Sequence, residues 1–161
     1  MIEKTRVTEE FDNQGVSYEF MWDTTTGLVS GMDIARGLNA VPEKVFKTLV
    51  MGNRKKGCYF VFMIPVNRKM DTKKAKAVTG ERLSFASAEE LAEETGYEQG
   101  GCSPVATLKK LPVFFDQSAA NFDTIIFGAG ENSYHVEVTL EELKKAIDFQ
   151  LADIAGDIQE E

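Results

Sequence analysis

The chain has 161 residues, of which 43% are hydrophobic and 27% charged, the composition of an ordinary globular domain. Its formal net charge of −8 argues against a general nucleic-acid binder. The sequence has no run of about 18 apolar residues, and its first residues lack the apolar segment of a signal peptide. The two cysteines form neither a disulfide framework nor a metal-binding spacing. We therefore expect a cytoplasmic protein without membrane spans, formed by a single domain over residues 1–161.

Basic residues are concentrated in one stretch. Between Gly52 and Arg82, nine basic and two acidic residues give +7, which leaves −15 for the rest of the chain. A local surface that contacts phosphate groups would have this distribution. A solvated helix face with loop lysines would have it too, and the pattern leaves both interpretations open. The candidate RNA-contacting residues are Arg54, Lys55, Lys56, Lys73 and Lys74.

The first part of the chain shows helix and strand patterns separated by turn signals. Val7 and Phe11 have helical spacing in an acidic segment that Gly15 ends. Ser30, with Asp33 three residues later, is typical of a helix N-cap. The elements predicted here are a helix over 3–13, a strand over 16–22, a loop over 23–27, a helix after Ser30 and a short helix at Pro42.

The central part is rich in strand signals. Residues 58–64 are apolar on both faces, which indicates a central, doubly covered strand. We expect it to pair with a strand over 45–51 through a hairpin at 52–57. The other elements predicted are a helix over 71–79, a short strand over 83–85, a helix from Ser87 to a glycine-rich loop, and strands over 111–116, 124–128 and 134–138.

The C-terminal segment predicts a long helix. Thr139 and Glu142 have the spacing of a capping box. An apolar stripe then follows at helical spacing, formed by Leu143, Ile147, Leu151 and Ile154. Six or more strands mixed with four or five helices indicate one α/β domain around a curved, mixed sheet.

Lys47 is unusual within its predicted strand. A period of two places it on the same face as Val45, Leu49 and Met51. A strand-end lysine can reach out of a core so that its charge stays in water. It can equally point into a pocket, and the pattern alone leaves this open.

The segment from Gly96 to Pro104 contains three glycines and a proline within nine residues. Glycine permits positive φ angles and close approach of the backbone to a ligand, and such loops hold anions or carbonyl oxygens with their N–H groups. The simpler interpretation is a helix-to-strand corner with Gly96 at the helix end. The residues alone favour this corner, because the spacing matches neither a dinucleotide-binding nor a P-loop motif.

The order of these motifs resembles the YbaK/EbsC family. The resemblance rests on the F-K-T-L strand around Lys47, D-T-K-K at 71–74, and T-G-Y-x-x-G-G-x-S-P at 95–104. It continues through K-K-L-P at 109–112, F-D-T-I at 122–125 and the turn that contains Gly128 and Gly130. It covers roughly residues 16–154.

The resemblance implies editing of mischarged tRNA in trans, with deacylation of Cys-tRNA(Pro) the activity most associated with this branch. It implies a compact α/β fold around a mixed, barrel-like sheet, and neither a metal nor an organic cofactor. The implied partner is aminoacyl-tRNA, with a prolyl-tRNA synthetase as a second candidate.

The resemblance also implies roles for individual residues. Lys47 matches the essential lysine, and the loop from Gly100 to Pro104 matches the wall that holds the aminoacyl ester. In the Cys-specific members the substrate's own thiol attacks its ester carbonyl, so that the enzyme orients the substrate and stabilises charge. The candidate substrate-binding residues are Asp23, Tyr97, Gly100, Gly101, Cys102, Ser103, Pro104, Gly128, Gly130 and His135.

Three positions depart from the family pattern. Asp23 aligns where close relatives tend to carry tyrosine, His135 where they tend to carry aspartate, and Ala106 where glycine is usual. All three lie near the implied pocket. The preferred amino acid is therefore less certain than the family, and alanine or serine are alternatives to cysteine.

Two rival interpretations remain. Cys102 and His135 could form a nucleophilic pair, which would require a lowered pKa of the thiol. The protein could also be a non-catalytic module that binds aminoacyl-tRNA or a synthetase, or an envelope-related regulator. The presence of Lys47 with a whole glycine loop argues against the non-catalytic interpretation.

Overall fold

The computed structural model describes residues 2–22 and 30–159 of the chain. Most helices begin and end where the sequence provides a cap. Ser87 and its partner Glu90 form a capping box at the start of α4, and Asp71 accepts hydrogen bonds from two backbone N–H groups of α3. The helices are α1 (Arg6–Gln14), α2 (Gly31–Gly37), α3 (Thr72–Thr79), α4 (Ala88–Thr95) and α5 (Leu140–Leu143), with 3-10 turns at Pro42–Lys44 and Gln117–Asn121.

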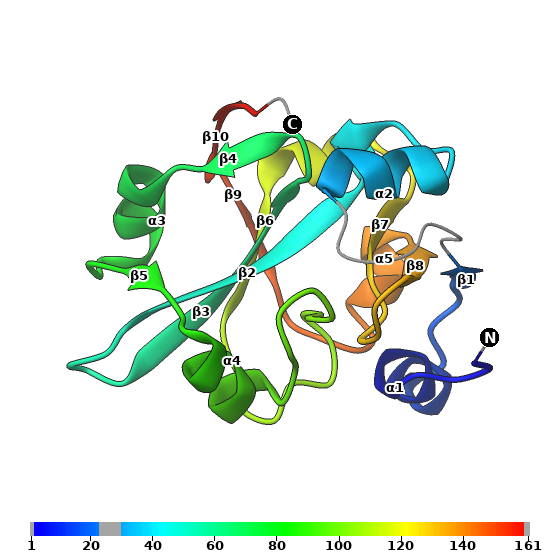
Figure 1. Cartoon of the computed structure of the whole chain (residues 1–161), viewed down its shortest axis with the longest axis horizontal. Coiled ribbons are helices and arrows are strands. Elements are labelled where there is room, and N and C mark those ends of the chain that lie inside the picture. The colour runs from blue at the N-terminus through cyan, green and yellow to red at the C-terminus, as the bar shows by residue number, and fades with distance from the viewer. Residues whose placement is uncertain (1, 23–29, 160–161) are drawn as a thin grey trace.

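A five-stranded mixed sheet forms the centre of the molecule (Figure 1). Its strands, in spatial order, are β5 (Ser84–Phe85), β2 (Phe46–Asn53), β3 (Cys58–Pro65), β6 (Val113–Asp116) and β9 (Gln150–Ala152). β2 and β3 pair antiparallel along their whole length, whereas β6 pairs parallel with both β3 and β9. The predicted central strand and its hairpin partner are therefore confirmed.

Two smaller sheets complete the fold. The first has the order β1 (Glu19–Trp22), β8 (Tyr134–Val138) and β7 (Ile125–Gly128), all antiparallel, and the second pairs β4 (Arg68–Met70) with β10 (Ala155–Ile158). A parallel bridge between Val45 and Ile126 joins the three-stranded sheet to the start of β2. The predicted mixed α/β class is confirmed, with the strands distributed over three sheets.

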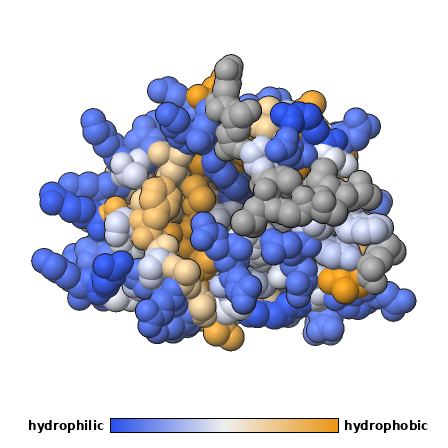
Figure 2. Space-filling model, viewed as in Figure 1, coloured by the Kyte–Doolittle hydropathy of each residue, from blue (hydrophilic) through white to orange (hydrophobic). Residues whose placement is uncertain are grey.

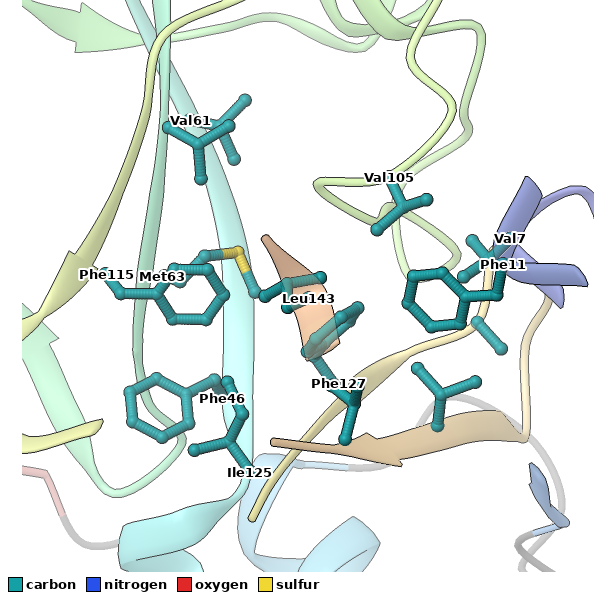
Figure 3. Close-up of a cluster of buried hydrophobic side chains, with 14 of the residues drawn as sticks. Val7, Phe11, Phe46, Val61, Met63, Val105, Phe115, Ile125, Phe127 and Leu143 are labelled. Carbon is teal, nitrogen blue, oxygen red and sulfur yellow. The ribbon is translucent and has the colours of Figure 1, made fainter. Parts of the chain in front are cut away.

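The main core fills the space between the two larger sheets, α1 and the glycine loop (Figure 3). Phe46, Met63 and Phe115 enter it from the five-stranded sheet, Phe127 enters from β7, and all four are at most 2% exposed. A second cluster lies on the opposite face of the five-stranded sheet, under α3, and a third lies between α2 and the bridge of Val45 with Ile126.

The predicted C-terminal helix is wrong beyond its first turn. α5 ends at Leu143, and the chain continues into β9 and β10. Asp116, at the end of β6, accepts hydrogen bonds from the backbone N–H groups of Ile154 and Ala155 at 3.1 and 2.9 Å. These bonds, and the burial of Ile154 in the second cluster, stabilise an extended path. Tertiary contacts thus override the helical spacing of the apolar residues.

Candidate active site

Lys47 lies on β2 at one end of the second cluster. Leu49 and Met51 pack in that cluster, whereas Val50 packs in the main core on the other face. Alternation along the strand therefore places Lys47 with Leu49 and Met51, as the sequence predicts. Its partner on β3 is Ile64, which belongs to the second cluster as well. Lys47 is partly exposed, so its charge lies at the border of an apolar surface.

The bridge between β2 and β7 brings Lys47 close to the glycine turn. Val45 and Ile126 are partners in that bridge, and both belong to the third cluster. Lys47 and Gly128 each lie two residues further along parallel segments. They therefore fall at the same level and on the same side.

β8 adds His135 to this side. Its backbone partners are Gly128 on β7 and Met21 on β1. Met21 packs against the third cluster, whereas Val136 points into the main core. His135 therefore projects toward the side that carries Lys47, and it is 8% exposed. The structure thus places three sequence-predicted site residues, Lys47, Gly128 and His135, on one side of adjoining strands.

The glycine loop reaches the same place through its backbone. A Cβ atom on Gly128 would lie 3.0 Å from the carbonyl oxygen of Cys102, which is closer than nearly all such contacts. A Cβ atom on Gly101 would lie 3.6 Å from the carbonyl oxygen of Gly130. The loop therefore packs on the turn between β7 and β8 and borders the strand face that carries Lys47. Ser103, whose Oγ accepts from the N–H of Val105, is fully buried, and the neighbouring Pro104 is also buried.

Arg6 holds both ends of this loop, a role that the sequence analysis missed. Its guanidinium donates hydrogen bonds to the carbonyl oxygens of Thr95 and Gly96 at one end and of Ala106 at the other, at 3.1 to 3.3 Å. It also lies 4.5 Å from the ring centroid of Tyr97. An arginine fork can satisfy several acceptors at once. No local signal could reveal the contact, because the partners lie about a hundred positions away.

Tyr97 and Gly130 support the loop from inside. The Tyr97 hydroxyl donates to the carbonyl oxygen of Val105 at 2.6 Å, and the side chain is 4% exposed. Burial raises the pKa of Tyr97 to about 12, so the hydroxyl remains a donor. A Cβ atom on Gly130 would lie 3.1 Å from the Tyr97 ring. Both residues therefore help to shape the loop.

Ala106 stands at a position where the family pattern has glycine, and its backbone conformation explains why glycine is usual there. Its φ angle is +57°, in the left-handed region that favours glycine. Gly100, with a φ angle of +90°, is a glycine where the backbone requires one. The loop of this chain therefore contains a strained alanine whose carbonyl oxygen Arg6 binds.

The surroundings of Cys102 do not suit a nucleophile. Its side chain packs against the main core, and burial raises the pKa of the thiol to about 11. His135 instead projects from the face of the three-stranded sheet that is turned away from the main core, toward the third cluster. A nucleophilic cysteine needs a lowered pKa and an adjacent base. The arrangement therefore favours a structural role for the Cys102 side chain, with its carbonyl group at the site. Asp23 lies outside the described residues.

The predicted RNA-contacting residues fall into two groups. Arg54, Lys55 and Lys56 form the tip of the hairpin between β2 and β3, whereas Lys73 and Lys74 lie at the start of α3 (Figure 1). Several of them already have partners within the protein. Arg54 forms two hydrogen bonds with Glu90, Lys56 pairs with Glu81, and Lys74 contacts Asp153 and the carbonyl oxygen of Ala155. Lys55 and Lys73 are exposed.

A separate surface hollow of about 690 Å³ lies beside α1 and the segment after the glycine loop. Pro104 is the sequence-predicted site residue that it shares, and Leu111, Lys144 and Ile147 are among its other walls. Lys47, Gly128 and His135 do not line it. Strand register and backbone approach place the candidate site elsewhere, on the side of Lys47.

The fold is that of an aminoacyl-tRNA editing domain. The family model described as "Aminoacyl-tRNA editing domain" matches residues 30–146, so the chain belongs to that family. The family predicted from the sequence motifs and the class of activity, aminoacyl-tRNA editing, are confirmed. In the described part of the chain, no helix is long and apolar enough to cross a membrane.

Individual relatives agree with this assignment. The chain is 31% identical over 150 residues to the "Putative Cys-tRNA(Pro)/Cys-tRNA(Cys) deacylase EbsC" of Enterococcus faecalis, covering 92% of this chain and 90% of that one. It is 28% identical over 117 residues to a proline–tRNA ligase of Dechloromonas aromatica, covering 70% of this chain but 20% of the ligase. A solved structure of a "putative trans-editing enzyme for prolyl tRNA synthetase" has the same fold, with a TM-score of 0.81 at 23% identity, covering 94% of this chain and 96% of that one.

Proposed function

We propose that this chain removes cysteine from mischarged tRNA in the cytoplasm, with Cys-tRNA(Pro) as its preferred substrate. The observation that carries the proposal is the similarity to the EbsC protein over 92% of the chain, because the name of that protein gives both Cys-tRNA(Pro) and Cys-tRNA(Cys). The match to part of a proline–tRNA ligase supports tRNA(Pro). A prolyl-tRNA synthetase is the proposed source of the mischarged tRNA.

The chemistry that we propose uses the substrate's own thiol. The thiol sulfur attacks the ester carbonyl, a carbon–sulfur bond forms, and the carbon–oxygen bond to the ribose breaks. The products are a cyclic thiolactone and the tRNA, whose ribose hydroxyl receives the proton of the thiol. Negative charge develops first on the carbonyl oxygen and then on the departing ribose oxygen.

Lys47 is proposed to stabilise this charge. It is a cation at the edge of an apolar surface, where electrostatic interactions are stronger than in bulk water. The backbone of the loop from Gly100 to Pro104, together with Gly128 and His135, forms the proposed wall that orients the ester. No nucleophile from the protein is needed, which agrees with the raised pKa of the Cys102 thiol.

A panel of charged tRNAs tests the proposal. tRNA(Pro) charged with cysteine, alanine, serine or proline is incubated with catalytic amounts of the protein, and the released tRNA and amino-acid product are measured. We expect the cysteinyl ester to react fastest and to yield a thiolactone, which an added thiol can trap by opening the ring. Faster release of alanine or serine would contradict the assignment to cysteine. Stoichiometric binding without release from any ester would indicate a binding module.

A further inference from the structure

The face of the five-stranded sheet that carries Lys47 continues away from it as a series of apolar rows. The register pairs Leu49 with Phe62, and it pairs Met51 with Phe60 on β3 and with Phe85 on β5. All these side chains point to the face of Lys47, because paired residues project to the same side of a sheet. From the row of Lys47 to the row of Met51 the strand rises roughly 13 Å.

Aromatic rings dominate these rows. The rings of Phe62 and Phe114, which are buried beneath this surface, stack with centroids 5.7 Å apart and an interplanar angle of 17°. The ring of Phe60 lies 6.3 and 6.4 Å from them. Phe85, at the far end, is 53% exposed, and Phe60 is partly exposed. Figure 2 shows a hollowed apolar surface where β2 and β3 pass beside α3 and β5.

Positive charge borders this surface. α3 packs on it through Ala75, and Lys73 and Lys76 on the same helix are exposed. Arg82, just before β5, is exposed as well. The surroundings therefore combine one exposed ring, Phe85, and one partly exposed ring, Phe60, with cations, in a chain whose net charge is −8. Stacking platforms with a basic border are typical of sites for single-stranded nucleic acid.

We propose that this aromatic face, from Lys47 to Phe85, binds the unpaired 3′ end of the charged tRNA. The proposal rests on the function proposed above, since it takes Lys47 as the point where the ester lies. The terminal nucleotide then sits beside Lys47, and the preceding nucleotides stack toward Phe60 and Phe85. The length is sufficient for a few nucleotides, because bases in a stacked strand repeat about every 3.4 Å. The phosphates face Lys73, Lys76 and Arg82.

The variant that tests this face is Phe85→Leu, which keeps apolar area but removes the flat ring. We expect KM for charged tRNA to rise at least about fivefold with kcat nearly unchanged, from the loss of one stacked base. An aminoacyl ester of adenosine alone cannot reach Phe85, so its KM should not change. Phe85→Trp should retain or improve binding. Ile158→Ala is the matched control, because Ile158 is 66% exposed on β10.

A second measurement separates this proposal from the catalytic one. Binding of an uncharged RNA oligonucleotide with the 3′ end of a tRNA is followed by fluorescence anisotropy, which needs no turnover. Weaker binding by Phe85→Leu but not by Ile158→Ala supports the aromatic face even if the panel above fails. Equal binding by Phe85→Leu and the unchanged protein overturns it. If the face instead pairs two copies of the chain, sedimentation will show a dimer that Phe85→Leu dissociates while RNA binding stays the same, and the proposal is again overturned.

Discussion

The two faces of the five-stranded sheet have the same strands but different surroundings. One face, with Val50, Val61 and Phe115, is closed by the three-stranded sheet and α1, and these side chains are at most 6% exposed. The middle of the other face is covered by α3, and Met51, Phe62 and Ile64 are fully buried there. Its ends carry the partly exposed Lys47 and the exposed Phe85. A closed face can contribute stability through dense packing. Exposed positions that carry a cation or an aromatic ring can bind a ligand, and loss of the Lys47 or Phe85 side chain should affect function more than stability.

The largest expected effect comes from Lys47→Ala. We expect the rate of deacylation to fall at least ~100-fold, the scale for losing one group that stabilises an oxyanion. The melting temperature should scarcely change, because the variant also removes the desolvation cost of a partly buried cation. Single-turnover kinetics and a thermal melt measure the two quantities.

Phe115→Ala is the matched control on the closed face. It should lower the free energy of unfolding by ~3–5 kcal/mol through loss of a buried aromatic side chain. Its folded fraction should retain most of the single-turnover rate. An active Lys47→Ala variant, or one that unfolds as readily as Phe115→Ala, would contradict the inference that the closed face contributes stability and that Lys47 contributes to function.

Arg6→Ala tests whether the glycine loop needs its support from α1. Without the guanidinium, the carbonyl groups of Thr95, Gly96 and Ala106 lose their shared donor, and the loop should shift by fractions of an ångström. Such misplacement is expected to lower kcat about tenfold, with a smaller change in KM. Arg6→Lys should recover part of the rate, because one charged donor remains. Lys4→Ala, a nearby exposed cation, is the control; an equal loss there would indicate a general effect on α1.

Ala106→Gly should stabilise the protein. The φ angle of +57° costs a residue with a Cβ atom about 1 kcal/mol relative to glycine. The melting temperature should therefore rise by a few degrees. Ala120→Gly is the control, because Ala120 lies in a 3-10 turn and has no positive φ angle. A lower melting temperature for Ala106→Gly would show that the loop gains more from the methyl group than it loses in strain.

Cys102→Ser should have the smallest effect, with most of the activity retained. The pKa of the thiol is raised to about 11, so below that pH the group is mostly protonated and a poor nucleophile. Alkylation of Cys102 by iodoacetamide should accordingly be slow at pH 8 and accelerate as the pH approaches 11. Loss of activity in Cys102→Ser together with an active Lys47→Ala would instead establish the Cys102–His135 pair.

Elements with local signals were predictable from the sequence. The hairpin of β2 and β3, the caps at Ser30, Asp71 and Ser87, and the strand at 134–138 follow from periodicity and capping chemistry within a few neighbouring residues. The placement of Lys47 on the face of Leu49 and Met51 follows from the same alternation.

Features that depend on distant partners were not predictable. The segment after Thr139 begins with a valid cap, but Glu142 accepts a hydrogen bond from the backbone N–H of Ser17 instead of closing the capping box. Asp116 then holds the following segment in an extended path. The hydrogen bonds from Arg6 to the glycine loop likewise join residues far apart in sequence. Neighbouring residues carry no information about such contacts.

The parallel pairing of β9 with β6 has a consequence for the order of assembly during synthesis. Residues 150–152 occupy one edge of the central sheet, and 155–158 pair with β4. Until they leave the ribosome, β6 has an unpaired edge of backbone N–H and C=O groups beside buried phenylalanines. Non-local parallel pairing also slows folding, because a long loop must close first. The nascent chain therefore carries an unpaired strand edge from the time β6 emerges until residues 150–152 emerge and pair with it.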